Sequence, residues 1–396
     1  MKKSLIFAAI AAVALSACAK FETFQSTSDE DAISFGVYAK KAALTRATYY
    51  GDQTTATLAN NANDYGFGVF AYYTQTADVS ASNTPNFMYN QQVFYDDTAD
   101  SQKYPTHWYY TPLKYWPNGQ NSTAVDNTTH ADKVSFYAYA PYTAVGDAAG
   151  VTAFTPANAT TAGLPVVTYV LPTNPAEQVD LLYATPVLNQ TKQTLASNIA
   201  FVFHHALSKV NLKVQAIADH ATASSGKLDA ATKIILTKVE VFGTFATTNT
   251  LSLATGDWTN PAVTTNDGTS AYITYNAADF GSTTTVNEVE GFDVTETLQD
   301  LNAAKPMIII PVEMAANKFK IQVTYHVITT DSALGGYSDV ENKIYALDTD
   351  GITFAKNKVN DVTVKIGVNS VDFTASVTDW DTPAVDGGTV YVPQNS

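Results

Sequence analysis

Arginine is almost missing from this chain of 396 residues, since Arg46 is the only one among 22 Lys and Arg residues. Charged residues of all kinds make up 15% of the chain, well below the usual share of about 25%. The formal net charge is −15. This shortage of positive charge argues against nucleic acid or an anionic membrane surface as a partner. The acidic surface also opposes indiscriminate self-association, so any self-assembly needs a specific mechanism.

Cysteine is equally scarce, because Cys18 is the only one and has no disulfide partner within the chain. It follows a positive n-region, Lys2 and Lys3, and an apolar segment at residues 5–15 that is too short to span a bilayer as a helix. The Leu-Ser-Ala-Cys sequence ending at Cys18 resembles the bacterial lipobox, where the cysteine receives the lipid. We therefore expect a signal peptide at residues 1–17 and an outer-membrane lipoprotein tethered by acyl chains on Cys18. The alternative is an ordinary cleavable signal with a chance cysteine.

Motifs for catalysis are missing too. The sequence has no nucleophile elbow, no zinc-binding spacing and no glycine loop for phosphate. His204 and His205 are adjacent, and neighbours on a strand point to opposite faces, so they cannot easily share one metal ion. The sequence therefore predicts no enzyme, no metal site and no cofactor.

Helical periodicity is weak everywhere, and only residues 295–303 could form a short helix. Alternating apolar residues instead recur along the chain, and residues 307–312 form a continuous apolar run typical of a strand covered on both faces. Many short strands separated by turns predict an all-β chain with two β-sandwiches, at residues 47–196 and 197–380. The alternating segments lie at residues 67–73, 134–140, 199–203, 319–327, 362–368 and 371–377.

A further strand is expected near the N-terminus. Ile33, Phe35 and Val37 alternate with small or polar residues, which is the pattern of a strand with one buried face. The lone Arg46 follows this strand, and Ala47 comes next. Cleavage between the two would detach the strand and leave a hole where it had packed. The alternative for Arg46 is an ordinary exposed residue in a loop.

Aromatic residues are concentrated at residues 107–117, HWYYTPLKYWP. Exposed Trp and Tyr rings can stack on sugars, so Trp108, Tyr109 and Trp116 are candidate glycan contacts. The alternative is that these rings pack in the core and at its corners.

The same aromatic cluster resembles the tryptophan-proline motif of the fimbrillin family, the type V pilus subunits of Gram-negative anaerobes. Other segments resemble family motifs in the same order, and together they cover nearly the whole chain beyond the signal peptide. These segments are residues 134–141 (VSFYAYAP), 180–184 (DLLYA), 203–210 (FHHALSKV), 307–311 (MIIIP), 356–367 and 377–380 (VTDW).

This resemblance implies two transthyretin-like Greek-key β-sandwiches in tandem and an exported lipoprotein precursor. It also implies that an Arg-specific protease cuts between Arg46 and Ala47 and so removes a lipidated propeptide, residues 18–46. In the precursor, the strand carrying Ile33, Phe35 and Val37 would fill a groove that cleavage then empties.

A donor strand from the next subunit would occupy the emptied groove. The family places this strand at the C-terminal end, which here is the tail at residues 381–396, with a possible start near residue 371. Val390, Tyr391 and Val392 are the candidate donor residues. A head-to-tail contact of this kind does not close on itself and builds a fibre.

The expected partners are other fimbrial subunits, an Arg-specific protease, the outer membrane through the lipid, and a host or bacterial surface receptor. The expected final location is a fimbrium on the cell surface, where it supports adhesion. A surface lipoprotein that binds glycans, and a tip or anchor subunit of the same pilus, remain as alternatives.

Overall fold

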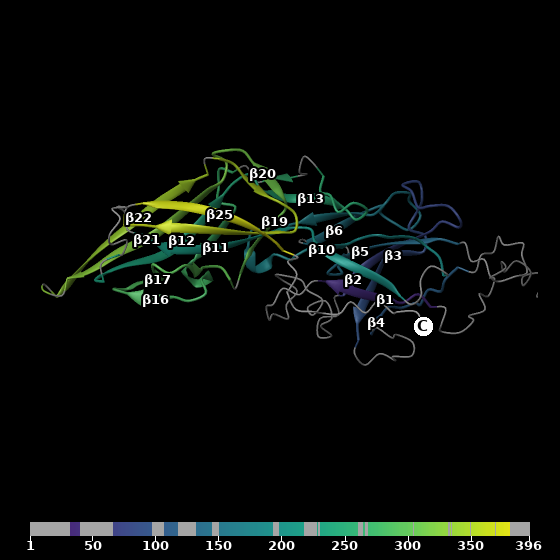
Figure 1. Cartoon of the computed structure of the whole chain (residues 1–396), viewed down its shortest axis with the longest axis horizontal. Coiled ribbons are helices and arrows are strands. Elements are labelled where there is room, and N and C mark those ends of the chain that lie inside the picture. Colours follow the sequence, from purple (N-terminus) through teal and green to yellow (C-terminus); the bar gives the residue numbers. More distant parts are fainter. Residues whose placement is uncertain are drawn as a thin grey trace, which may run out of the picture.

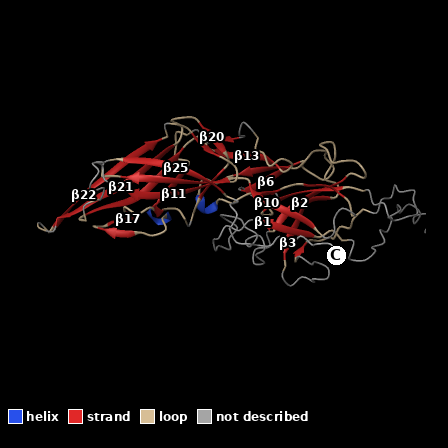
Figure 2. Ribbon diagram, in the orientation of Figure 1, coloured by secondary structure: helices blue, strands red, loops and turns tan. Residues whose placement is uncertain are grey.

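The computed structural model describes residues 32–39, 66–96, 107–117, 132–144, 150–192, 198–217, 228, 230–259, 264–265, 268–303, 305–331, 333, 335–348, 350–368 and 370–380. Strands dominate this part of the chain, with two one-turn 3-10 helices, η2 (Pro175–Glu177) and η3 (Ala277–Asp279), and no α-helix (Figure 2). The all-β prediction is therefore confirmed. No helix among these residues is long and apolar enough to cross a membrane.

The strands from the first half of the chain form one large sheet, which lies towards one end of an elongated molecule (Figure 1). Strand β1 lies at one end of its order and pairs in parallel with β10. In sheet order the strands are β1 (Phe35–Ala39), β10 (Ile199–His205), β8 (Leu182–Ala184), β5 (Val134–Ala140), β2 (Phe67–Tyr73), β3 (Met88–Tyr95) and β4 (Trp108–Tyr109), with β9 (Val187–Gln190) also on β5.

Both faces of the central strands β2 and β5 are buried. Phe67 and Val69 pack into a core formed within this sheet, whereas Phe70 and Tyr72 face a second core on its other side. The sequence predicted the first face from its alternation but not the second. Burial raises the pKa of Tyr72 above its ordinary value and that of Tyr137 to about 12, so both phenols on the second face stay neutral.

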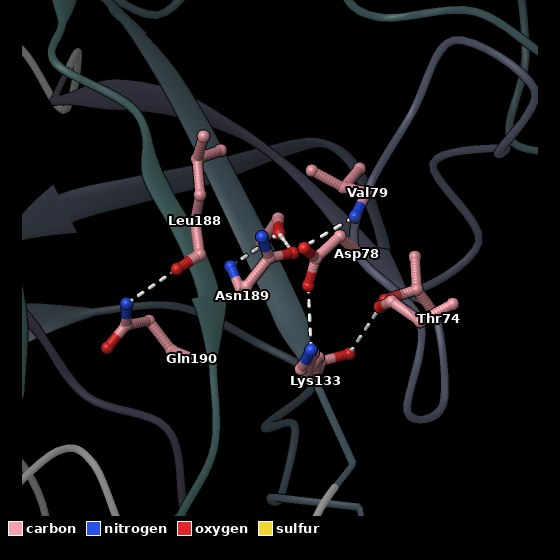
Figure 3. A network of polar contacts seen from close by, with 9 residues as sticks. Thr74, Asp78, Val79, Lys133, Leu188, Asn189 and Gln190 are labelled. Carbon is pink, nitrogen blue, oxygen red and sulfur yellow. Dashed lines mark hydrogen bonds and ion pairs between the residues drawn. The ribbon is translucent and has the colours of Figure 1, made fainter.

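A polar network fastens β9 to the rim of this sheet (Figure 3). Asn189 accepts a hydrogen bond from the Val79 backbone N–H at 2.9 Å and donates its own N–H to Ser135 Oγ at 2.8 Å. Lys133 and Asp78 form an ion pair at 2.7 Å beside it. Asn189 has a positive φ of 54°, a conformation that asparagine tolerates better than most residues. The polar run at residues 189–197 (NQTKQTLAS) therefore begins within strand β9.

A second sheet joins the two halves of the chain. Its order is β14 (Thr264–Thr265), β13 (Ala246–Ser252), β7 (Val166–Val170) and β6 (Gly150–Thr155). Strand β13 comes from the second half and pairs antiparallel with β7, with Leu251 opposite Val167. Strand β10, which follows the expected division near residue 196, is hydrogen-bonded in the first sheet, and the chain leaves that sheet only at Ala206 and Leu207.

Trp258 secures the segment that follows β13 to this junction. Its indole N–H donates to the Ala206 carbonyl at 2.7 Å, and its ring meets Tyr169 edge-on at 6.1 Å. Replacing Trp258 with Phe leaves the carbonyl without this donor, and we expect a loss of about 1–3 kcal/mol in the free energy of unfolding. Urea unfolding measures the change. A loss below about 0.5 kcal/mol, the scatter of neutral surface substitutions, would contradict this assignment.

The second half of the chain forms a sandwich of two main sheets. One sheet has the order β18 (Gln299–Asp300), β11 (Ser208–Ala216), β24 (Lys358–Ile366) and β25 (Val371–Asp379), with β19 (Met307–Ile309) on β11. The other has the order β16 (Thr284–Val286), β17 (Val289–Val294), β12 (Thr232–Phe242), β21 (Lys320–Asp331) and β22 (Gly336–Leu347), with β15 (Ile273–Asn276) on β12. Strands β20 (Val312–Met314) and β23 (Ile352–Phe354) pair separately.

The facing sides of these sheets carry the alternating apolar residues that the sequence indicated, including Val362, Val364 and Val323. The expected helix at residues 295–303 is wrong, because this segment contains β18, which pairs with β11. Asn302 explains the difference: its side chain accepts from the Leu212 N–H at 2.7 Å and donates to the Val210 carbonyl at 3.3 Å. These hydrogen bonds hold the segment against β11 in place of a helical turn.

Candidate functional site

The inner face of the first sheet encloses a core that β1 completes. Ile33 and Phe35 are 1% and 0% exposed, and Val37 packs against the same core half-buried. The three side chains share one face because residues two apart on a strand point the same way. We call the space that they occupy, between β10, β2, β5 and the segment at residues 110–115, the β1 groove.

Phe35 lies at the centre of the β1 groove. Its ring stacks on Phe201 of β10 with centroids 5.8 Å apart, and it meets three other rings edge-on. Those rings are Phe67 of β2 at 6.1 Å, Tyr110 at 5.3 Å and Phe136 of β5 at 6.1 Å. One side chain therefore joins three strands of the sheet and the segment that follows β4, and its removal would leave an apolar cavity among them.

Backbone hydrogen bonds hold this N-terminal segment on two sides. On one side β1 runs parallel to β10, with Phe35 opposite Ile199, and the Ile199 N–H donates to the Ser34 carbonyl at 2.8 Å. On the other side the Ile33 N–H donates to the Lys114 carbonyl at 2.8 Å. A strand that left the groove would expose these donors and acceptors along with the apolar face.

Tyr110 is a groove residue that sequence reasoning missed. Its hydroxyl donates to the Ile33 carbonyl at 2.7 Å, and it accepts from the Lys114 N–H at 3.3 Å, while the ring is 1% exposed. A buried tyrosine normally needs a partner for its hydroxyl. That rule signals that Tyr110 has a partner, but nothing in the sequence says that the partner is the N-terminal strand.

The aromatic cluster lies at the rim of this core. Trp108 is 5% exposed, and its ring packs against Phe67 at 5.1 Å and Tyr95 at 5.3 Å, so the packing alternative describes its position. Tyr109 and Trp116 are half-buried, with centroids 4.9 Å from Phe94 and 6.2 Å from Phe136 respectively. Glycan contact through Tyr109 and Trp116 stays a prediction.

Several predicted site residues lie outside the described part of the chain. They are Cys18, Arg46, Ala47, Val390, Tyr391 and Val392. His204 and His205 are described and have different partners: Thr185 Oγ1 lies 3.1 Å from His204 Nε2, and Asp180 Oδ2 lies 2.6 Å from His205 Nδ1. Among the described residues, no three His, Cys, Asp or Glu side chains are grouped so that they could hold a metal ion.

Comparison with known proteins adds to this geometry. A family model described as fimbrillin-like matches residues 45–380. This chain belongs to the fimbrillin-like family. The fimbrillin-like chain is 31% identical over 222 residues to "Fimbrium subunit Fim1C" of Phocaeicola vulgatus, an alignment covering 54% of this chain and 51% of that protein. The chain thus spans about half the length of the curated relative that it matches.

The fold has a counterpart among solved structures. A crystal structure of a fimbrial protein from Bacteroides vulgatus ATCC 8482 is similar to the fimbrillin-like chain, with a TM-score of 0.63 and 22% sequence identity. The match covers 88% of this chain and 99% of that one. At this identity the likeness establishes the fold. The resemblance drawn from the aromatic cluster and the other motifs is confirmed at the level of the family.

Proposed function

We propose that this fimbrillin-like chain is a structural subunit of a surface fimbria that polymerises by donor-strand exchange and supports adhesion. In this proposal the chain is exported as a lipoprotein on Cys18, and an Arg-specific protease cuts between Arg46 and Ala47. The segment that carries β1 then leaves the β1 groove, and the C-terminal tail of a neighbouring subunit fills it. The lipid anchors the precursor in the outer membrane until cleavage releases it.

The central position of Phe35 carries this proposal. A terminal strand that only covered the sheet would place its side chains at the rim, whereas Phe35 contacts rings from three strands and from the segment that follows β4. Full burial of an aliphatic or aromatic side chain contributes roughly 1.5–3 kcal/mol. Vacating the groove therefore exposes a surface with a strong tendency to take up another strand.

The tail has a pattern that suits this role. Val390 and Val392 are two residues apart and would share one face of an extended strand, with Tyr391 on the other. In the uncut chain β1 is covalently attached, so a competing tail must displace an intramolecular partner. Cleavage after Arg46 ends the covalent attachment of β1. After the cut, β1 is held in the groove only by its non-covalent contacts, and a tail can compete with it.

The test is to treat purified residues 18–396 with an Arg-specific protease. We expect a cut after Arg46, followed by ladders of oligomers that survive SDS without boiling. Arg46→Lys is the matched control, because it keeps the positive charge and resists this protease, and it is expected to stay a folded monomer. A chain that is cut after Arg46 and remains monomeric would contradict the proposal.

A further inference from the structure

Four side chains from distant segments meet where the two halves of the chain join. Asp180 precedes β8, His205 ends β10, Lys209 lies in β11, and Trp380 follows β25. They come from three separate segments of the sequence, because His205 and Lys209 are close neighbours in one of them, and the strand-exchange proposal uses none of them. Their arrangement therefore calls for an explanation of its own.

The four groups contact one another within a buried cluster. Asp180 Oδ2 lies 2.6 Å from His205 Nδ1, with the two side chains 0% and 3% exposed. The imidazole of His205 stacks on the indole of Trp380 with centroids 3.9 Å apart and planes inclined by 6°. Lys209 Nζ lies 5.9 Å from the centre of the same indole, within the range of a cation–π contact.

A carboxylate as deeply buried as Asp180 needs a hydrogen-bonded partner, because an isolated buried charge is very costly. His205 supplies that partner and is thereby held in one orientation. Its ring plane then fixes the plane in which Trp380 can stack. The main chain adds to this, since the Trp380 N–H donates to the Asn357 carbonyl at 3.0 Å.

The position of this cluster connects it to the proposed assembly of subunits. Trp380 directly precedes the tail at residues 381–396, so it is the root of that tail. His205 ends β10, two residues beyond Phe203, the last residue of that strand that pairs with β1. One ring stack therefore links the root of the proposed donor to the strand that would receive a donor from another subunit.

We propose that Asp180, His205, Lys209 and Trp380 form a clamp that fixes where the C-terminal tail leaves the body of the subunit. This inference rests on the proposed function, in which the tail is the donor. Trp380 and His205 are positioning residues: they set the point from which the tail reaches a neighbour, and they take no part in the groove itself. Loss of the clamp lets the tail leave at a variable point, which lowers its effective concentration at the neighbouring groove.

The test separates donating from accepting a strand. Trp380→Ala and Asp180→Asn are compared with wild type, with Asp361→Asn as the control. Asp361 is also a paired carboxylate of the second half, bonded to Lys213 at 2.8 Å, but it lies outside the clamp. After Arg-specific cleavage of residues 18–396, two rates are measured: ladder formation, and uptake of a labelled synthetic peptide of residues 381–396.

We expect both clamp variants to form ladders at least about tenfold more slowly while they take up the peptide at the wild-type rate. The Asp361→Asn control is expected to match wild type in both assays. Ladder formation at the wild-type rate in Trp380→Ala overturns the clamp. Equal losses in ladder formation and peptide uptake also overturn it, because they indicate general damage to the subunit.

The fluorescence of the uncut chain tests the clamp independently of strand exchange. The emission of Trp380 is obtained as the difference between wild type and Trp380→Phe. In Asp180→Asn we expect this emission to shift to longer wavelength, because a released indole is more exposed to water. An unchanged emission overturns the clamp even if ladders form. Conversely, if wild type forms no ladders, the proposed function fails while the emission still decides on the clamp.

Discussion

Replacing Phe35 with Ala is expected to lower the free energy of unfolding of the uncut chain by about 3–5 kcal/mol, the usual loss for a phenylalanine deleted from a core. The loss is large because four surrounding rings come from elements that cannot close around the cavity without moving the sheet. Urea unfolding of residues 18–396 measures it.

Two comparisons sharpen this result. Tyr337→Ala removes an aromatic ring that is 55% exposed on β22 and is expected to change stability by less than about 0.5 kcal/mol. After cleavage and departure of β1, Phe35→Ala subunits are expected to form ladders like wild type, because the substituted strand is no longer present. A Phe35→Ala loss no larger than that of Tyr337→Ala would contradict the central position of Phe35.

Removing the tail, residues 381–396, is expected to abolish ladder formation after cleavage while it leaves the β1 groove able to accept a strand. Such a subunit can receive a donor but cannot supply one, so each chain that it joins stops growing at that point. Mixed with an equal amount of cleaved full-length subunits, it is expected to shorten the ladders. Gel electrophoresis without boiling measures both effects.

The control for this deletion is uptake of the labelled peptide of residues 381–396. The shortened subunit is expected to bind it as full-length subunits do, which shows that the groove is intact. Ladders of wild-type length from the shortened subunit alone would show that the donor lies elsewhere in the chain.

The sequence predicted which strand faces are apolar, but it did not predict which strands pair with one another. Alternation located Ile33, Phe35 and Val37 on a buried face, because a period of two is a local property of the chain. Their partners were not predictable in the same way. The parallel register with β10 joins residues more than 160 positions apart, and no local pattern encodes such a pairing.

The contacts where the two halves of the chain join could not be predicted from local sequence patterns either. Asp180, His205 and Trp380 each lie in a segment that resembles a family motif, but their contact depends on the meeting of three segments from both halves of the chain. The expected division near residue 196 rests on composition, namely the polar run at residues 189–197. A polar stretch suggests a linker, yet strand pairing and not composition decides to which sheet β10 belongs.

Exchange of β1 for a tail can be tested most directly by locking β1 in place. Tyr38 of β1 lies opposite Val202 of β10, which is 41% exposed. Neighbouring strands lie about 4.8 Å apart, within the range of about 4.4–6.8 Å that a disulfide can join. Tyr38→Cys and Val202→Cys are combined with Cys18→Ser, so that the introduced pair holds the only thiols.

The measurement is ladder formation by this variant after Arg-specific cleavage, with and without a reductant. Strand exchange predicts that the oxidised protein is cut after Arg46 yet stays monomeric, and that reduction of the disulfide starts polymerisation. Ladders that form equally well while β1 is still linked to β10 would contradict the account.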